Sequence, residues 1–572
     1  MGTSSARPDD LDAWATASRN LDDVLRTRKA TLDRLHSEFT TGLGWGQFDA
    51  SSLLQGFGGW MTWNERDAQW VGTIATAFRD AGAGTVPDAV IEARLRAAGL
   101  NTTRLSVTYD DPIALGEPPT SGYANDPVNT ATGNFVEVEI DLVANGLVRL
   151  TRFVRTHNSR SDRAGPFGPG WASWASARLR REPDGAHWEA PDGQRAVIPR
   201  TPGPSDGDGG AAGDGAGSGG RAGYARVVGI PGLVVPAGDG LAVEWFGGGR
   251  SVFDGSGRPL AADDGPGTEV RFRHDGEHLV GIAHAGGATV TLAWDGDRVA
   301  ELRSSDGRRV GYRYDDQGRL VEVHGPTGVR RYEVDDRGRV VAVVDADGVV
   351  EVRNRYDDDG RVLAQVSPHG RRSRFRYLAG RVTMVDDDAG GPVNSFVHDE
   401  HGRLVGLVDG HGTELVKVYD RWGNPVAVTE RNGATTRQDW DDRARLVRRV
   451  GPDGRAVTFA YDDRDRVVEV AVRAATAGAP APATAAVTAA VTRYRYDGDE
   501  RIPVEIVDPE GGVTRLTVEG GLLRRVVDPD GVAVRFAFDA GGNLTSATDA
   551  LGNTAVVERD RAGRPAATVS PT

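Results

Sequence analysis

The heptapeptide YDDQGRL, residues 314–320, is one copy of a motif that recurs along the second half of the chain. Six further full copies and one shorter copy, YLAGRV, begin at Val334, Tyr356, Tyr377, His398, Tyr419, Trp440 and Tyr461. Successive copies start 20 to 22 residues apart. Weaker copies begin at Phe253, His274, Trp294, Tyr496, Val518, Phe538 and Arg559. A fixed period of this size indicates a repeat architecture, so the 572 residues cannot be divided into ordinary domains by length alone.

Each copy has the pattern of a β-hairpin. The Asp and Gly of the motif suit a tight turn, and a second turn follows about ten residues later. These second turns are GPTG at 325–328, DADG at 345–348, SPHG at 367–370 and GPDG at 451–454. Short segments of alternating apolar and polar residues, such as 319–323 and 339–343, separate the turns. Because one hairpin is marginal in water and long sheets twist, we predict a mainly β fold in which tandem hairpins form a spiralling sheet, or shell.

The N-terminal region has a helical pattern instead. Leu11, Trp14, Leu21, Leu25, Leu32, Leu35 and Phe39 follow a 3-4 spacing, which predicts one helix over 11–39. A second helix is predicted from Trp60, Trp63, Trp70, Ile74 and Ala77, after a Gly-rich stretch at 40–59. A third short helix has Pro87 at its first turn and Gly99 just past its end. We therefore predict a small helical bundle over residues 1–105.

Between the helices and the repeats, residues 106–245 are predicted to form a separate β module. The segments 135–142 and 148–154 alternate as half-buried strands do. The Gly-rich stretch 202–223 predicts a flexible loop. Residues 246–572 are predicted to be the repeat shell, with an Ala/Thr/Pro-rich protruding loop at 471–491.

Composition excludes several functions. The net charge of -14 disfavours nucleic acid as a partner, and the absence of cysteine excludes disulfides and thiolate zinc sites. The N-terminus lacks the features of a secretory signal peptide, and no uncharged apolar run is long enough for a membrane span. We expect the protein to be cytoplasmic before export and then secreted or held at the cell surface. Its export route would not depend on a conventional signal peptide.

No catalytic, cofactor or metal site is predicted. The acidic stretches 357–360 and 345–348 lack the EF-hand spacing and fit turns better. His274, His278 and His284 lie in a segment predicted as strand and turn, where they do not cluster. Serine nucleophile and phosphate-binding motifs are absent. A glycosidase would need two placed carboxylates, but among 82 acidic residues the sequence does not single out a pair. We therefore expect that the chain is not an enzyme.

The 21-residue unit resembles the RHS/YD repeat over residues 245–570. The repeat-signature residues are Tyr314, Asp315, Gly318, Arg319, Tyr356, Asp357, Gly360, Arg361, Tyr419, Asp420, Gly423, Tyr461 and Asp462. Two earlier motifs, DPVNTATGNF at 126–135 and RSDRAGPFGPGW at 160–171, resemble the DUF6531-like segment that precedes the repeats in RHS polymorphic toxins. Their key residues are Asp126, Pro127, Asn129, Gly133, Asn134, Ser161, Gly165, Pro166, Gly168, Gly170 and Trp171. The resemblance implies a cocoon-like β-shell that encloses a C-terminal toxin domain, used in competition between bacteria.

Two features bear on how far this resemblance extends. The N-terminal helices resemble, more weakly, the WXG-type hairpins of type VII-like secretion, although Trp45-Gly46 lacks the Trp-x-Gly spacing and a plain packing bundle explains the helices too. The stretches 508–511 and 528–531 look like the DPxG of the family's self-cleaving module. They occupy the second-turn position of the repeat, so we interpret them as turns.

These features predict a non-catalytic scaffold that encloses and delivers a toxin domain outside this chain. The expected partners are that toxin domain, a secretion apparatus and, through the toxin, an immunity protein. An alternative from another functional class is a surface adhesion or carbohydrate-binding protein. Aromatic rings on the outer face of the shell would favour this alternative. A remnant without present activity is a third alternative.

Overall fold

The computed structural model describes most of the chain in two compact units. The described residues are 3–5, 7–42, 51–81, 85–100, 114–143, 149–201, 223–265, 268–284, 286–378, 381–387, 393–474, 489–539, 542–559 and 565–570. Unit 1 contains Met1–Thr108 and Tyr377–Val382, and unit 2 contains Tyr109–Arg376 and Thr383–Thr572. Trp45-Gly46, residues 202–222 of the predicted flexible loop and residues 475–488 of the predicted protruding loop lie outside the described residues.

Unit 1 contains the predicted helices. These are α1 (Pro8–Gly42), α2 (Ser51–Asp80) and α3 (Asp88–Ala97), accompanied by a strand pair, β1 (Thr3–Ser5) and β2 (Thr85–Pro87). A small core forms from Ala77, Phe78, Val86, Ile91 and Leu95. The predicted stop at Gly99 is confirmed by its φ of 69° and by the hydrogen bond from the Leu100 amide to the Leu95 carbonyl. Pro87 ends β2 and precedes α3, one position earlier than predicted.

Most of the predicted leucine stripe of α1 lies on an exposed face, although Leu11 packs against the core of unit 1. Among the α1 side chains whose burial the structure describes, Ala15 and Asp22 are buried, and the Asn64 amide of α2 donates hydrogen bonds to Ser18 and Asp22. By contrast, Trp14, Leu21, Leu32 and Leu35 are exposed. The 3-4 pattern identified the helix but not the face that meets α2, because hydrogen bonds to Asn64 hold a polar face inward.

Unit 2 begins with small sheets that we call the pre-repeat module, residues 114–201. A three-stranded sheet contains β5 (Val136–Val143), β6 (Arg152–Asn158) and β9 (Trp171–Ala172). A second contains β10 (Arg178–Glu182), β11 (Gly185–Glu189) and β12 (Arg195–Pro199). Two short pairs complete it, β3 (Tyr123–Ala124) with β4 (Val128–Asn129) and β7 (Ala164–Gly165) with β8 (Gly168–Pro169). Both predicted strands are confirmed, except that Arg149–Thr151 forms a 3₁₀ turn before β6.

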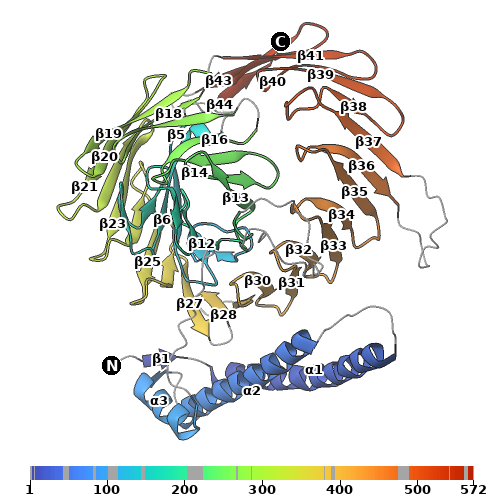
Figure 1. Cartoon of the computed structure of the whole chain (residues 1–572). Helices are drawn as coiled ribbons and strands as arrows, with labels where there is room; N and C mark the ends of the chain where they lie inside the picture. Colours follow the sequence, from blue (N-terminus) through green and yellow to red (C-terminus); the bar gives the residue numbers. More distant parts are fainter. Residues whose placement is uncertain are drawn as a thin grey trace. The chain divides into compact units, whose positions relative to one another are not determined.

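The rest of unit 2 is one antiparallel sheet of 32 described strands, in which each strand pairs with the next along the chain. Within unit 2 this sheet bends around module strands β5, β6 and β12 (Figure 1). The predicted mainly β repeat fold is confirmed. The strands are β13 (Gly232–Ala237), β14 (Gly240–Trp245), β15 (Arg250–Phe253), β16 (Pro259–Asp263), β17 (Val270–Asp275), β18 (His278–His284), β19 (Thr289–Asp295), β20 (Arg298–Ser304), β21 (Arg309–Tyr314), β22 (Leu320–Gly325), β23 (Gly328–Val334), β24 (Val340–Val344), β25 (Val350–Tyr356), β26 (Val362–Val366), β27 (Arg372–Leu378), β28 (Val382–Asp387), β29 (Asn394–His398), β30 (Leu404–Val408), β31 (Glu414–Tyr419), β32 (Pro425–Thr429), β33 (Thr435–Trp440), β34 (Leu446–Val450), β35 (Ala456–Tyr461), β36 (Val467–Arg473), β37 (Ala490–Arg495), β38 (Glu505–Val507), β39 (Val513–Glu519), β40 (Leu522–Val527), β41 (Ala533–Phe538), β42 (Leu544–Thr548), β43 (Thr554–Arg559) and β44 (Pro565–Val569).

Each residue of the YD-x-x-G-R signature has a distinct role in its turn. In the copy at Tyr314, one carboxylate oxygen of Asp315 accepts the backbone N–H groups of Gln317 and Arg319. Its other oxygen accepts the Arg319 Nε–H at 2.6 Å. Gly318 adopts a φ of 70°, which favours glycine. The Tyr314 hydroxyl donates to the Val299 carbonyl of the preceding unit at 2.7 Å, so the ring ties neighbouring units together.

The acidic stretches serve the same turns. Asp357 accepts the N–H groups of Asp359 and Arg361, and Asp528 accepts those of Asp530 and Val532. The turn interpretation of 357–360 and 528–531 is therefore confirmed. A register shift, or β-bulge, marks most of the motif aromatics, and it also marks the weaker copies at Phe253, His274, Trp294, Val518, Phe538 and Arg559.

Candidate functional site: the module–shell interface

The pre-repeat module contacts the shell along one row of motif turns. The Val299, Val362 and Leu404 amides donate to the carbonyl oxygens of Pro166, Gly133 and Thr120, at 3.0, 2.9 and 2.9 Å. The Ser159 hydroxyl donates to the Gly360 carbonyl, and the Leu179 amide donates to that of Gly257. These contacts join residues that are far apart in sequence. The module therefore holds successive hairpins of the shell in a fixed arrangement.

The first pre-repeat motif, 126–135, builds part of this interface. Asp126 exchanges two hydrogen bonds with the Gln365 side chain of β26, through its backbone N–H and carbonyl. Asn129 caps a turn by accepting the N–H groups of Ala131 and Thr132, and the Pro127 carbonyl accepts the Val136 N–H. The Asn134 amide donates to Asn158 at 2.8 Å. Gly133 supplies its carbonyl to Val362, so this motif brings shell contacts and internal turns together.

The second motif uses glycines where backbones approach closely. A Cβ on Gly168, whose φ is 92°, would lie 2.8 Å from the Gly318 carbonyl of the shell. A Cβ on Gly170 would lie 2.7 Å from the His157 ring. Gly165 pairs with Gly168 across β7 and β8. Ser161 accepts a hydrogen bond from Arg195, and Trp171 packs edge-on against Tyr332 of the shell at 5.2 Å.

The centre of the interface is a buried arginine that the sequence analysis missed. Arg155 of β6 is 0% exposed, and its Nη2 lies 2.7 Å from an oxygen of Asp141 on β5. The Tyr312 hydroxyl of the shell donates to the other Asp141 oxygen at 2.6 Å. The Arg155 guanidinium also lies over the Trp171 ring, 4.4 Å from its centroid. Arg155 directly follows the predicted strand 148–154, so the alternation did not include it, whereas the structure extends β6 to Asn158.

Three alternating carboxylates of β5, those of Glu137, Glu139 and Asp141, face the shell. Arg330 of β23 pairs with Glu139, with Glu137 at 2.9 Å and with Glu351 of β25 at 2.6 Å. One guanidinium therefore serves three carboxylates. Burial, together with the nearby charge of Glu139, raises the pKa of Glu137 to about 8. The interface thus contains a titratable group that changes charge near neutral pH.

The module covers only the earlier part of the sheet. Tyr312 and Tyr332, each two residues before a motif aromatic position, are 9% and 3% exposed. The residues at the same position in later units, Phe459, Tyr494 and Phe536, are only partly buried and are more exposed than Tyr312 and Tyr332. From Glu414 onward, Ala471 is the sole buried hydrophobic side chain among the described residues. The face that the module packs against in early units is therefore open in late units.

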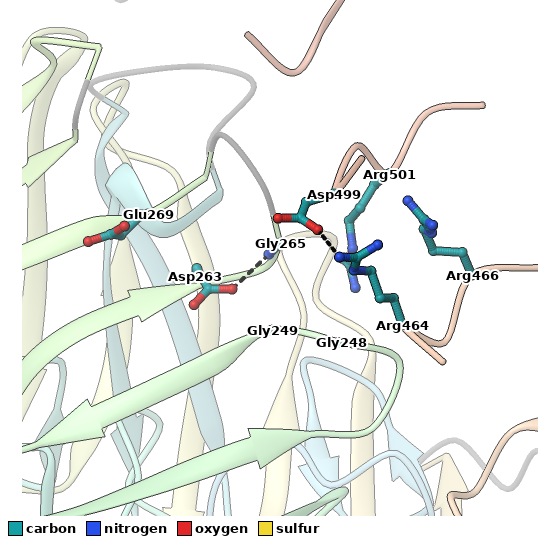
Figure 2. A pocket seen from close by; sticks show the side chains of 9 residues that line it. All are labelled: Gly248, Gly249, Asp263, Gly265, Glu269, Arg464, Arg466, Asp499 and Arg501. Carbon is teal, nitrogen blue, oxygen red and sulfur yellow. Dashed lines mark hydrogen bonds and ion pairs between the residues drawn. The ribbon is translucent and has the colours of Figure 1, made fainter. Parts of the chain in front are cut away.

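A cavity of about 530 Å³ lies where the turn at 498–501 meets the turns that follow β14 and β16 (Figure 2). Arg464 pairs with Asp499 at 2.5 Å, Arg466 donates to the Glu500 carbonyl at 2.7 Å, and Arg501 donates to the carbonyl oxygens of Asp264 and Gly247. Gly248, Gly249, Asp263, Gly265 and Glu269 complete the lining. Since the three guanidiniums already have protein partners, this cavity is a contact between early and late turns. Within the described ranges, no group of three potential ligands is arranged to hold a metal ion.

Family models match segments on both sides of this interface, in the pre-repeat module and in the shell. Residues 271–441 match the Teneurin YD-shell model, residues 519–554 the RHS Repeat model and residues 125–198 the DUF6531 model, a domain of unknown function. The repeats are RHS/YD repeats. The matches leave the helices of unit 1 uncovered. A search of curated protein sequences gave no match.

Solved structures similar to this RHS/YD-repeat chain include TcdB2-TccC3, with 15% identity and a TM-score of 0.34 over 58% of this chain and 23% of that chain. Another is TcdB2-TccC3 without its hypervariable C-terminal region, with 12% identity and a TM-score of 0.37 over 57% of this chain and 27% of that chain. The chain therefore spans about a quarter of the length of these solved chains.

Substitution of Gly360 by alanine is expected to weaken the attachment of the module to the RHS/YD shell. The added Cβ would lie 2.7 Å from the Ser159 carbonyl. Gly370→Ala is the matched control, because its φ of 77° is close to the 79° of Gly360 but nothing lies within 4 Å of its Cβ. Both variants incur about 1–2 kcal/mol of backbone strain, and Gly360→Ala should lose roughly a further 1–3 kcal/mol from overpacking. Thermal unfolding followed by tryptophan fluorescence measures the difference, and equal losses would contradict the assigned contact.

Proposed function

We propose that the RHS/YD shell is a non-catalytic scaffold that encloses a toxic polypeptide and delivers it to a competing bacterium. The supporting observation is the open apolar face of the late units. Phe459 pairs with Val470, Tyr494 with Ile506 and Phe536 with Ala547 across neighbouring strands. Residues at intervening positions are charged, such as the exposed Arg495 and Arg515, which share one rung with the partly buried Glu505 between them. An apolar face beside a charged face favours a covered interior over a water-facing one.

The same arrangement disfavours the adhesion alternative. The rings that precede the motif aromatics lie on the face that the module covers, while the opposite face carries salt bridges such as Arg313–Glu322 and Arg353–Glu333. A carbohydrate-binding surface would instead present aromatic rings outward. Within this proposal, the toxin domain lies outside the chain, an immunity protein acts on the toxin, and unit 1 addresses the shell to a secretion apparatus. The protein is secreted or surface-bound in that case. No described helix is long and apolar enough to cross a membrane.

The test is to purify the native product from its own host and to analyse it by intact mass measurement and limited proteolysis. A co-purifying polypeptide that resists protease while the shell is intact would support the container. Phe459→Asp should release this polypeptide, because it places a charge on the apolar face. Ala460→Asp, at the next and exposed position of β35, is the matched control and should retain it. A native product without any enclosed polypeptide would refute the proposal.

A further inference from the structure

The large exposed hydrophobic side chains of α1 lie along one side of the helix. We call them the α1 stripe: Trp14, Leu21, Val24, Leu32 and Leu35. Each of these residues is between 38% and 52% exposed. At 3.6 residues per turn they fall within about a quarter of the helix circumference, and they extend over about 32 Å of its axis. Single exposed hydrophobic residues are normal, but a continuous apolar stripe of this length is typical of a surface that binds another protein.

The α1 stripe is not the side of the helix that packs against α2. α1 lies alongside α2 (Figure 1), and its α2-facing side holds the buried Ala15 and Asp22. The Asn64 amide donates to Asp22 on this side at 2.9 Å. Ala15 and Asp22 lie about a third of a turn around the helix from the centre of the stripe. α1 therefore packs one side against α2 and presents a second, apolar side outward.

The spacing of the stripe is that of a helix that pairs with another helix. Positions 14, 21 and 35 belong to a seven-residue series, and the exposed Arg28 occupies the remaining position of that series. A seven-residue apolar interval is the pattern with which two helices pack side by side in a coiled coil. The expected partner is therefore a helix, and its charges must suit Arg28.

The charges on the stripe favour a second copy of α1 as that helix. The exposed Asp10 lies eighteen residues, or about five turns, before Arg28, so both point to the side of the stripe. Among the described residues, neither Asp10 nor Arg28 forms an ion pair. An acidic first turn and a basic residue in the second half make the stripe complementary in charge to itself when two copies run antiparallel. Parallel copies would instead bring Arg28 face to face with Arg28.

We propose that two copies of this chain associate through their α1 stripes, with the two α1 helices antiparallel. A two-fold axis relates the copies, so the same surface serves on both sides of the contact. The acidic first turn of each helix, with Asp9 and Asp10, then lies toward the half of the other helix that holds Arg28. This inference does not depend on the proposed function, because it concerns unit 1 alone and involves no enclosed polypeptide.

The first measurement is the mass of the full chain in solution, by light scattering after size-exclusion chromatography. One copy has a mass of 60.8 kDa, and the dimer is expected at twice this value. Leu21→Glu with Leu32→Glu should weaken the dimer about a hundredfold or more, because two leucines lose their burial and two charges enter the contact. Leu260→Glu with Val418→Glu is the matched control, since these residues are 42% and 49% exposed but belong to unit 2. Circular dichroism and thermal unfolding of both variants control for folding.

The second measurement tests the orientation without disturbing the stripe. The chain has no cysteine, so a single introduced cysteine can carry a spin label for a distance measurement between two copies. Ala13→Cys and Thr31→Cys place labels at exposed positions beside the stripe, eighteen residues apart. Parallel helices would keep both label pairs near the interaxial separation of about 10 Å. Antiparallel helices must hold at least one label pair about 27 Å or more apart along the axis.

The expected result is a dimer that the stripe variant dissociates and the control does not, with a long distance at one or both label sites. A full chain that stays monomeric at submillimolar concentration would overturn the proposal and leave the stripe to a different protein. A dimer that survives the stripe variant would overturn it as well, because the contact would then lie elsewhere. Short distances at both label sites would contradict the antiparallel arrangement.

Discussion

Replacement of Arg155 by methionine is expected to destabilise unit 2 by about 3–5 kcal/mol, the usual cost of breaking a buried ion pair from one side. In the variant, the Asp141 carboxylate, whose side chain is 4% exposed, would still accept a hydrogen bond from the Tyr312 hydroxyl but would lose its buried counter-charge. The cation would also be lost from the face of Trp171. Urea unfolding followed by tryptophan fluorescence measures the effect, because Trp171 lies within the cluster.

Two controls separate charge burial from loss of packing. Arg163→Met removes an exposed guanidinium, 3.6 Å from Glu189, and should change stability by less than about 1 kcal/mol. The double variant Arg155→Met with Asp141→Leu removes both buried charges and should recover most of the loss. A midpoint for Arg155→Met within about 1 kcal/mol of wild type would show that the buried pair does not hold the module to the shell.

Local chemistry explains why the repeat could be predicted from sequence. In each unit the Asp caps its own turn, the Gly adopts the turn conformation and the Arg returns to the Asp, all within five residues, as Asp315 and Arg319 show. Such features depend on spacing alone. For the same reason two weaker copies were found at the correct bulge positions: the copy at His274, which lacks the Tyr, Gly and Arg of the signature, and the copy at Phe538, which lacks its Tyr and Arg.

Long-range contacts explain what the sequence did not reveal. The partners of Asp141 and Ser159 in the shell are Tyr312 and Gly360, which lie 171 and 201 residues further along the chain. The alternation of β5 predicted a strand, but it did not predict that its polar side would be the docking face. Its Glu and Asp residues suggested solvent, whereas the structure pairs them with Arg155 and Arg330. A polar strand face is therefore ambiguous until its partner is known.

Replacement of Glu137 by glutamine is expected to change the pH dependence of stability between about pH 4.5 and pH 8. The pKa of Glu137 is about 8 in the folded protein, against an ordinary value of 4.5. Between these values the folded protein holds a proton that the unfolded chain releases, so stability falls as the pH rises through this window. Above pH 8 the deprotonated Glu137 adds a third charge beside Glu139 and Glu351, with Arg330 as their shared cation.

Glutamine mimics the protonated carboxyl, so the variant and wild type should be equally stable near pH 4.5. The variant should then become progressively more stable than wild type up to about pH 9, by a few kcal/mol at most, as a shift of this size implies. Glu333→Gln, on the exposed outer face where Glu333 pairs with Arg353, is the matched control and should show a flat difference. Thermal midpoints across this pH range measure both. A flat difference for Glu137→Gln would mean that Arg330 keeps Glu137 ionised, and the interface would then hold its module equally well at every pH in the window.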